Sequence, residues 1–359
     1  MADKVLVLGG SYFVGRKLVE YLAEHGYAVT VLNRGTRPLA VEGVTQICCD
    51  RNDGEGMKAA LAGKVFDYVI DVSWQDVSWV EKLCAALSFD SVKKLVFISS
   101  SAVYDVEHLQ IPFAETDALG ENKYWTFYGT GKMDAENYYS KFLRDKSTDL
   151  VMLRPPYIYG EYNYAQRESL IFRQLLEDKP VVIPKSRPRE TLIKAFPSPN
   201  LRSEAAASTA NSCDPPEASM EAQECFHRMQ FIYTEDLAAI IDCLLKRETG
   251  KESVFNVGNR EAVTSKEWVE ACAKVAGKTP RIVEIDYLEL GRNVRDFYPF
   301  FDYDNVLEVS KINAIIERET DFAEGLKRSY SWFAENRESI VFKANVDKNL
   351  YEIIAELSV

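Results

Sequence analysis

The chain has 359 residues, of which 47% are hydrophobic and 27% are charged. This composition is typical of a folded globular protein with a large core, and it excludes wholesale disorder. The formal net charge of −12 argues against a nucleic-acid partner, because nucleic-acid binders gain most of their affinity from clustered Lys and Arg. A small anionic ligand in a local pocket is compatible with this charge.

The cysteines and the apolar runs indicate the compartment. Seven cysteines occur without a Cys-x-x-Cys spacing, so the sequence predicts no metal site, and the odd number fits a reducing compartment. The N-terminus lacks the features of a secretory signal, and no later apolar run approaches bilayer length. We therefore expect a cytoplasmic protein with no membrane partner.

The N-terminal residues predict a strand, a glycine-rich turn, a helix and a second strand. Residues 4–8 and 28–32 are apolar runs typical of strands in a parallel sheet, and apolar residues recur at helical spacing between them from Val14 to His25. A turn that leads a strand into a helix binds phosphate, because backbone N–H groups and the helix dipole face the anion. The expected dinucleotide contacts in this turn are Gly9, Ser11, Tyr12, Phe13, Val14 and Gly15.

Two positions depart from the usual dinucleotide-binding pattern. Tyr12 stands in place of the middle glycine, which normally lets the backbone approach the pyrophosphate, so its side chain must turn away or the cofactor must shift. Asn33 replaces the acidic residue expected at the end of the second strand, and Arg34 and Arg37 follow it. Arginine suits a 2′-phosphate better than a bare hydroxyl, which favours NADP over NAD. The alternative is that these arginines belong to a solvated loop.

Further apolar runs alternate with helical patterns, which predicts a doubly wound parallel sheet. The expected strands cover residues 44–49, 66–72, 94–99 and 150–153, and the expected helices cover residues 56–62 and 77–87. Ligands bind at the carboxyl ends of such strands, which adds Asp50, Arg51, Ser73 and Ser99 to the expected cofactor contacts. Asp50 could accept from an adenine amino group, although a strand-end aspartate that caps the next turn is at least as common.

Tyr128 and Lys132 are four residues apart, so on a helix they share one face. The ammonium of Lys132 would stabilise the phenolate of Tyr128 and lower the tyrosine pKa towards neutral pH. Tyr128 would then act as a general acid and base. Because the same spacing occurs on ordinary solvated helix faces, the pair alone does not establish catalysis.

Several motifs together resemble a known family. They are residues 9–15, Asp50, residues 99–104, the Tyr128 and Lys132 pair, and residues 154–160. In order and separation they resemble the extended short-chain dehydrogenases/reductases, the NAD-dependent epimerase/dehydratase family, in a variant with the turn Gly-Gly-x-x-Phe-x-Gly. The resemblance implies an α/β fold, a Rossmann doubly wound parallel sheet with a smaller C-terminal α/β subdomain that binds the substrate.

The resemblance also implies roles for individual residues. Ser100 would hydrogen-bond the reacting substrate oxygen, Tyr128 would be the acid and base, and Lys132 would bind the nicotinamide ribose and lower the pKa of Tyr128. Pro155, Tyr157 and Ile158 would contact the nicotinamide of NAD or NADP. The candidate substrate contacts are Ser101, Tyr104, Arg228 and Arg295.

Two departures from the family pattern narrow the range of reactions and substrates that the chain is expected to have. Dehydratases carry an Asp-Glu pair where this chain has Ser101 and Ala102, which argues against a 4,6-dehydratase. An epimerase or a reductase acting on a sugar or nucleotide-sugar needs only hydride transfer and one proton exchange. The arginine that grips a nucleotide diphosphate is replaced by Met229, with Arg228 one place away, and this puts a UDP-sugar in doubt.

The chain is expected to divide into a dinucleotide-binding core over residues 1–160, a substrate-binding subdomain over residues 161–336 and a helical tail over residues 337–359. Residues 185–228 have little apolar periodicity, which predicts a mobile surface insertion, with an ordered lid as the alternative. Analogy with the family predicts a homodimer that pairs through helices in residues 76–87 and 124–143.

Two helix starts in the C-terminal half can be predicted from capping residues. Thr234 is expected to be the N-cap of one helix, and Thr264 with Glu267 is expected to form a capping box for another. The last helices are expected over residues 322–336 and 350–357.

Two hypotheses without catalysis stay open. The missing middle glycine also resembles the branch that contains the chloroplast stem-loop RNA-binding proteins, in which the fold serves binding. The net charge of −12 and the set of Ser100, Tyr128 and Lys132 argue against this hypothesis. The other hypothesis is a regulator that binds a dinucleotide without turnover, and only a substrate would separate it from an enzyme.

Overall fold

The fold is organised around a seven-stranded sheet in which all neighbouring strands are parallel. The computed structural model describes residues 2–37, 39–73, 76–187, 227–317 and 319–357. In spatial order the strands are β10 (Glu252–Asn256), β6 (Asp149–Arg154), β5 (Lys94–Ile98), β4 (Tyr68–Asp71), β1 (Lys4–Leu8), β2 (Ala28–Asn33) and β3 (Thr45–Cys48). The order reverses between β1 and β4, which is where ligands bind in doubly wound sheets. The predicted fold class is confirmed.

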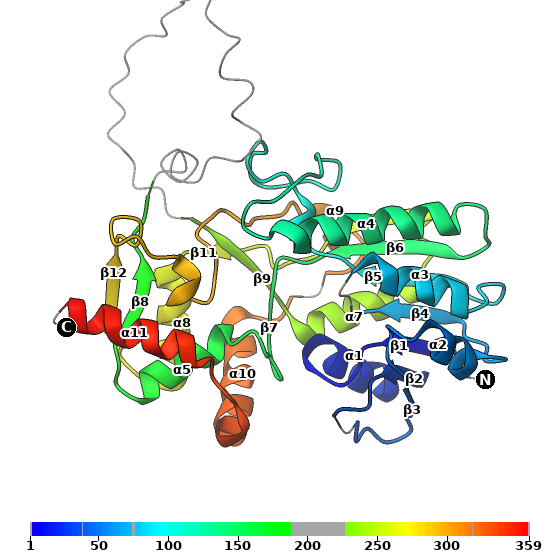
Figure 1. The fold of residues 1–359 in the computed structure, drawn as a ribbon, viewed down its shortest axis with the longest axis horizontal. Coiled ribbons are helices and arrows are strands. Elements are labelled where there is room, and N and C mark those ends of the chain that lie inside the picture. The colour runs from blue at the N-terminus through cyan, green and yellow to red at the C-terminus, as the bar shows by residue number, and fades with distance from the viewer. Residues whose placement is uncertain (1, 38, 74–75, 188–226, 318, 358–359) are drawn as a thin grey trace, which may run out of the picture.

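Helices cover both faces of this sheet (Figure 1). The helices α1 (Phe13–Glu24) and α7 (Thr234–Leu245) pack on one face, and α2 (Gly54–Leu61), α3 (Val77–Ala86) and α4 (Thr126–Leu143) pack on the other. Successive side chains of β1 alternate between the two cores: Val5 and Val7 belong to the first, and Leu6 and Leu8 belong to the second. This is why the strand reads as a continuous apolar run.

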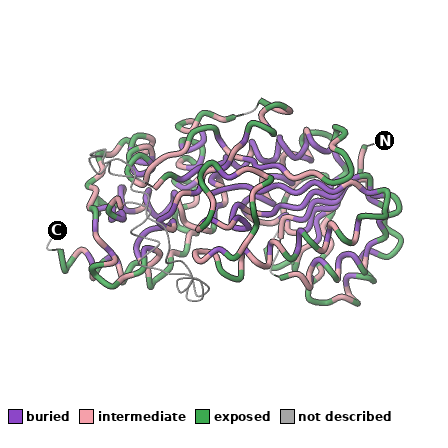
Figure 2. The backbone as a smooth tube through the Cα atoms, turned by 90° about the horizontal axis from the view of Figure 1, so that it is seen from above, coloured by how far each residue is buried: buried purple, intermediate pink, exposed green. Residues whose placement is uncertain are grey.

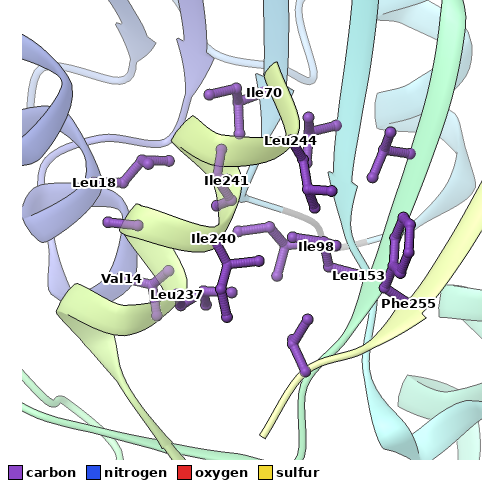
Figure 3. Packing of buried hydrophobic residues seen from close by; sticks show 14 of the residues in the cluster. Val14, Leu18, Ile70, Ile98, Leu153, Leu237, Ile240, Ile241, Leu244 and Phe255 are labelled. Atoms are coloured by element: carbon purple, nitrogen blue, oxygen red, sulfur yellow. The ribbon is translucent and has the colours of Figure 1, made fainter. Parts of the chain in front are cut away.

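The core on the α1 and α7 side shows how the sheet is held. Figure 3 shows Leu237, Ile240, Ile241 and Leu244 of α7 pointing at Ile98 and other residues of the strands. Each of these side chains is at most 5% exposed, and full burial of one such side chain stabilises the fold by roughly 1.5–3 kcal/mol. Buried residues are concentrated along the central strands in Figure 2.

Most of the elements after β6, apart from α7, α9 and β10, build a second layer of structure beside the main sheet. A three-stranded sheet joins β11 (Ala262–Val263), β9 (Met229–Tyr233) and β7 (Tyr157–Tyr159), and β8 (Val181–Pro184) pairs with β12 (Ile282–Ile285). The helices there are α5 (Arg167–Leu176), α8 (Ser265–Ala276), α10 (Phe322–Asn336) and α11 (Ala344–Glu356), whereas α9 (Ser310–Asn313) packs against β10 of the main sheet. Their core is aromatic: the rings of Phe231 and Trp268 stack with centroids 4.2 Å apart.

The capping predictions have different outcomes. The capping box is confirmed, because Thr264 Oγ1 accepts from the N–H of Glu267 at 3.2 Å and the Glu267 carboxylate accepts from the N–H of Thr264 at 2.7 Å. The prediction for Thr234 is wrong, because α7 begins at Thr234 itself and Tyr233 is the extended residue before it. The last helix begins at Ala344 rather than at 350. Most of the predicted insertion, residues 188–226, lies outside the described residues.

Candidate active site

A cavity of about 810 Å³ lies at the carboxyl end of the main sheet, at the reversal in strand order. Its size is that of a cavity for a cofactor or a small-molecule substrate. Most of the predicted site residues line it, including all three proposed catalytic residues. They are Gly9, Ser11, Tyr12, Phe13, Val14, Gly15, Asn33, Arg34, Arg51, Ser73, Ser99, Ser100, Ser101, Tyr128, Lys132, Pro155, Tyr157, Ile158 and Arg295.

The glycine-rich turn packs too closely for side chains at two of its positions. A Cβ at Gly15 would lie 1.9 Å from the carbonyl oxygen of Gly9, and a Cβ at Gly9 would lie 2.3 Å from the Cβ of Ser73. The turn therefore brings the N-terminus of α1 against the ends of β1 and β4. No side chain caps this helix at Tyr12, so the N–H groups of its first turn face an anion without a competing acceptor.

Tyr12 is accommodated by stacking and by strain in the next residue. Its backbone is extended, with φ −152° and ψ 148°, and its ring stacks on Tyr164 with centroids 5.5 Å apart. The guanidinium carbon of Arg37 lies 3.8 Å from the centroid of the same ring. Phe13 then adopts φ +44°, a left-handed conformation that residues with a side chain rarely adopt. The turn thus keeps its course without a glycine at position 12.

The start of α4 brings Tyr128 to Ser100. Ser100 precedes a short 3₁₀ helix, η1 (Ser101–Val103), and its Oγ accepts from the N–H of Ala102 at 3.1 Å. Gly129 lets α4 approach η1, because a Cβ there would lie 2.3 Å from the carbonyl oxygen of Ala102. A hydrogen bond joins the side chains of Tyr128 and Ser100. One turn further along α4, Lys132 Nζ donates to the carbonyl oxygen of Ile98 at 2.7 Å.

Burial governs the protonation of this pair. It raises the pKa of Tyr128 to about 12, although the Ser100 hydrogen bond and the charge of Arg167 oppose the shift. It lowers the pKa of Lys132 to about 8, which nearby Asp71 opposes. The net shift of the Tyr128 pKa is therefore upward, opposite to the direction predicted from its spacing to Lys132. The Lys132 Nζ lies 5.9 Å from the Tyr128 ring centroid and bonds to Ile98 instead.

Two predicted ligand contacts, Asp50 for the cofactor and Arg228 for the substrate, do not line the cavity. Asp50 is exposed, and its Oδ1 accepts from the N–H of Asn52 at 2.9 Å. It therefore caps the turn after β3, as in the alternative reading. Arg228 is also exposed, because it directly precedes β9, whose first residue Met229 points into the core.

Tyr104 is a structural residue. It is 0% exposed, its hydroxyl donates to Asn256 Oδ1 at 2.6 Å and accepts from Arg154 at 3.2 Å. Both partners belong to the ends of neighbouring strands, β10 and β6. Tyr104 thus ties these strands together below the cavity, and its prediction as a substrate contact is wrong.

Arg51 lines the cavity but is already engaged in a buried ion pair. Its guanidinium donates to both carboxylate oxygens of Asp71, at 2.6 and 2.9 Å, and to the carbonyl oxygen of Ser73. Asp71 also accepts from the Tyr139 hydroxyl at 2.6 Å. Arg51 therefore holds the end of β4 in place, and removing either partner would leave an uncompensated buried charge.

The sequence reasoning missed several residues of the cavity, above all cations. Arg167 and Lys343 contribute to its wall, and with Arg34, Arg37, Arg51, Lys132 and Arg295 they bring the cationic side chains to seven. Among the described residues, no Asp or Glu lines it. Further missed residues include Thr36, Trp79, Trp125, Tyr164 and Asn305. Local sequence gave no signal for them, because α5 and the chain near residue 343 reach the cavity only through tertiary packing.

The residues present fit a dinucleotide. The first turn of α1 offers backbone N–H groups, and several buried polar atoms of lining residues, among them Asn33 Nδ2 and Ser99 Oγ, have no partner among the described residues. A buried polar atom without a partner costs free energy that a ligand can recover. A doubly wound sheet with this turn at its switch point defines a Rossmann-type dinucleotide-binding protein.

The comparison with protein families extends this assignment. The family model described as NAD dependent epimerase/dehydratase family matches residues 5–188. The chain belongs to this family, as the motifs predicted. No helix among the described residues is long and apolar enough to cross a membrane, and no group of metal-binding side chains occurs among them.

The chain is similar to proteins whose names give different functions. The chloroplast stem-loop binding protein of 41 kDa b of Arabidopsis thaliana is 25% identical over 345 residues, which cover 91% of this chain and 78% of that protein. An epimerase of Escherichia coli O157:H7, the N-acetyl-alpha-D-glucosaminyl-diphospho-ditrans,octacis-undecaprenol 4-epimerase, is 32% identical over 188 residues, 45% of this chain and 51% of its own. The structure of MoeE5 in complex with UDP-glucuronic acid and NAD has a TM-score of 0.69 at 19% identity and covers 93% of this chain and 100% of its own.

Proposed function

We propose that the chain is an NAD(P)-dependent epimerase of a nucleotide-sugar, with Ser100, Tyr128 and Lys132 as its catalytic residues. The observation that carries this proposal is the hydrogen bond between Tyr128 and Ser100 in a cavity that also contains Lys132 and the glycine-rich turn. The family match and the epimerase activity for which the E. coli relative is named support it.

The residues of the chain would move one proton. Tyr128 would accept the proton of a sugar hydroxyl as that hydroxyl becomes a ketone, and would return it when the ketone is reduced. Ser100 would orient the same substrate oxygen, since its Oγ accepts from the N–H of Ala102 and keeps its own proton to donate. A bound nicotinamide would supply hydride transfer. Reduction on the opposite face of the ketone would invert the carbon.

Lys132 would contribute charge at the same place. Its pKa of about 8 leaves it mostly protonated at neutral pH. The ammonium would stabilise the phenolate form of Tyr128, which accepts the substrate proton and forms again when that proton is returned.

The end of the cavity next to Tyr128 suits an anionic substrate. Arg167 donates to the carbonyl oxygen of Ile158 at 2.8 Å, and Arg295 donates to that of Pro299. Neither forms an ion pair within the described part of the chain, and their mutual proximity contributes to the lowered pKa of Arg295, of which burial is the main cause. Two cations without a carboxylate partner are suited to the phosphoryl groups of a nucleotide-sugar. They would replace the arginine that the family pattern lacks at Met229.

The test is product formation with UDP-hexoses and UDP-N-acetylhexosamines, followed by NMR of the anomeric protons. We expect inversion at one carbon without net cofactor consumption, and loss of the reaction in Tyr128→Phe but not in the exposed control Tyr351→Phe. Net reduction of a keto substrate would instead identify a reductase. Elimination of water would contradict the reading of Ser101 and Ala102.

RNA binding is the second candidate function, since the stem-loop binding relative aligns with most of this chain. Because no Asp or Glu lines the cavity in the described part of the chain, it could accept a phosphate group of an RNA. We favour it less, because the net charge of −12 opposes the approach of a polyanion. A gel-shift titration with stem-loop RNA, in which unlabelled dinucleotide competes, distinguishes the two functions.

A further inference from the structure

The end of β2 presents a hydrogen-bond donor where related patterns present an acceptor. Asn33, the last residue of β2, uses its Oδ1 to accept from the N–H of Gly35 at 2.9 Å and from Gln46 Nε2 at 2.8 Å. These two donors fix the orientation of the amide, since a flipped amide would direct Nδ2 at both. Nδ2 is buried and has no partner among the described residues. The group left to bind a ligand is therefore a donor.

Two arginines that follow Asn33 in the sequence also line the cavity. Arg34 and Arg37 are exposed side chains that line the cavity, and neither forms an ion pair within the described part of the chain. The ring of Tyr12 holds the Arg37 guanidinium, whose carbon lies 3.8 Å from its centroid. Arg37 is thus positioned by the residue that replaces the middle glycine. Thr36 adds a hydroxyl to the same wall.

This set of groups selects for a phosphate over a hydroxyl. A bare ribose hydroxyl is uncharged and is usually recognised by a carboxylate that accepts from it, but no carboxylate lines the cavity in the described part of the chain. A phosphate monoester carries a charge of about −1.5 to −2 at neutral pH and has three acceptor oxygens. Two guanidinium groups and one amide donor match it in charge and in hydrogen bonding.

We infer that Asn33, Arg34 and Arg37 bind the 2′-phosphate of the dinucleotide, so that the protein uses NADP(H) in preference to NAD(H). This inference rests on the dinucleotide site of the proposed function and specifies its cofactor. It departs from the structural neighbour whose complex contains NAD. Tyr12 and Arg37 then form one unit, in which the aromatic ring that fills the glycine position orients a phosphate-binding guanidinium.

The test uses adenosine 2′,5′-bisphosphate and 5′-AMP, which share the adenosine and differ by the 2′-phosphate. Isothermal titration of the full chain with each probe reports binding without a nicotinamide and without turnover. We expect the bisphosphate to bind at least about tenfold more tightly. Arg34→Gln is expected to remove most of this difference and to leave the affinity for 5′-AMP within about threefold.

Controls separate a local contact from a change in net charge. Arg144→Gln removes one positive charge at the exposed end of α4 and is expected to leave both affinities unchanged. Asn33→Asp is expected to weaken the bisphosphate and to strengthen NAD. Equal binding of the two probes by the wild-type chain, or an equal loss of both affinities in Arg34→Gln, would overturn the inference.

Failure of the inference can be told from failure of the proposed function. If NADH and NADPH bind equally well by quenching of protein fluorescence, the preference is refuted and the dinucleotide site stands. If neither dinucleotide nor either adenosine probe binds to the folded chain, both the inference and the proposed function fail.

Discussion

Replacing Lys132 by Met is expected to stabilise the fold at pH 7 while it abolishes activity. Lys132 is 4% exposed, and burial lowers its pKa from 10.5 to about 8. At about 1.4 kcal/mol per pKa unit, keeping this ammonium charged in the fold costs about 3 kcal/mol. Loss of the hydrogen bond to Ile98 offsets about 1 kcal/mol of the gain. The net increase in the free energy of unfolding is about 2 kcal/mol.

The stability difference between the wild type and Lys132→Met is expected to depend on pH. Because the folded pKa lies below the unfolded value, the folded wild type binds fewer protons than the unfolded chain between pH 8 and 10.5. Wild-type stability therefore rises with pH across this window, and the advantage of Lys132→Met disappears. Urea unfolding at pH 7, 8, 9 and 10 measures the difference, with the exposed Lys141→Met on the same helix as control. A variant that is less stable at pH 7, or a difference independent of pH, would refute the reasoning.

Further predictions concern the turn and a buried acid. Gly15→Ala places a Cβ 1.9 Å from the carbonyl oxygen of Gly9, so we expect the affinity for dinucleotide to fall more than about tenfold. The control is Gly54→Ala, which should be tolerated because its Cβ meets only Lys82, at 3.5 Å. Equal dinucleotide affinities of the two variants would contradict the packing argument. Burial raises the pKa of Glu168 from 4.5 to about 7, so the folded chain binds the extra proton in this window and wild-type stability falls as pH rises through it. Relative to Glu168→Gln the fall is about 3 kcal/mol, measured by urea midpoints at pH 5 and 7.5; parallel pH profiles would contradict it.

The main sheet could be predicted because its signals are local. A strand buried on both faces reads as an apolar run, and β1 (Lys4–Leu8) coincides with the predicted residues 4–8. The glycine-rich turn and the capping box of Thr264 also depend on neighbouring residues only. Thr234 has the residue type of an N-cap, but α7 begins at Thr234 itself, directly after β9, which is one residue earlier than an N-cap at Thr234 would give.

The site was predictable only in part, because side-chain environment depends on tertiary packing. Strand ends were predicted to meet, and they do, but whether a strand-end side chain faces the cavity depends on its neighbours. Asp50 turns to the N–H of Asn52, and Tyr104 is drawn to Asn256. The direction of the Tyr128 pKa shift was missed for the same reason, since sequence spacing shows the nearby charge of Lys132 and does not show the burial that outweighs it.

The most direct test of the account is a stopped-flow measurement of nicotinamide reduction when the oxidised-cofactor complex meets the nucleotide-sugar that turns over. Because the pKa of Tyr128 is about 12, we expect the rate to rise with pH above neutrality as the phenolate becomes more populated. Tyr128→Phe should slow reduction at least about a hundredfold while the cofactor affinity stays within about threefold. Reduction at the wild-type rate in Tyr128→Phe would contradict the assignment of Tyr128 as the proton acceptor.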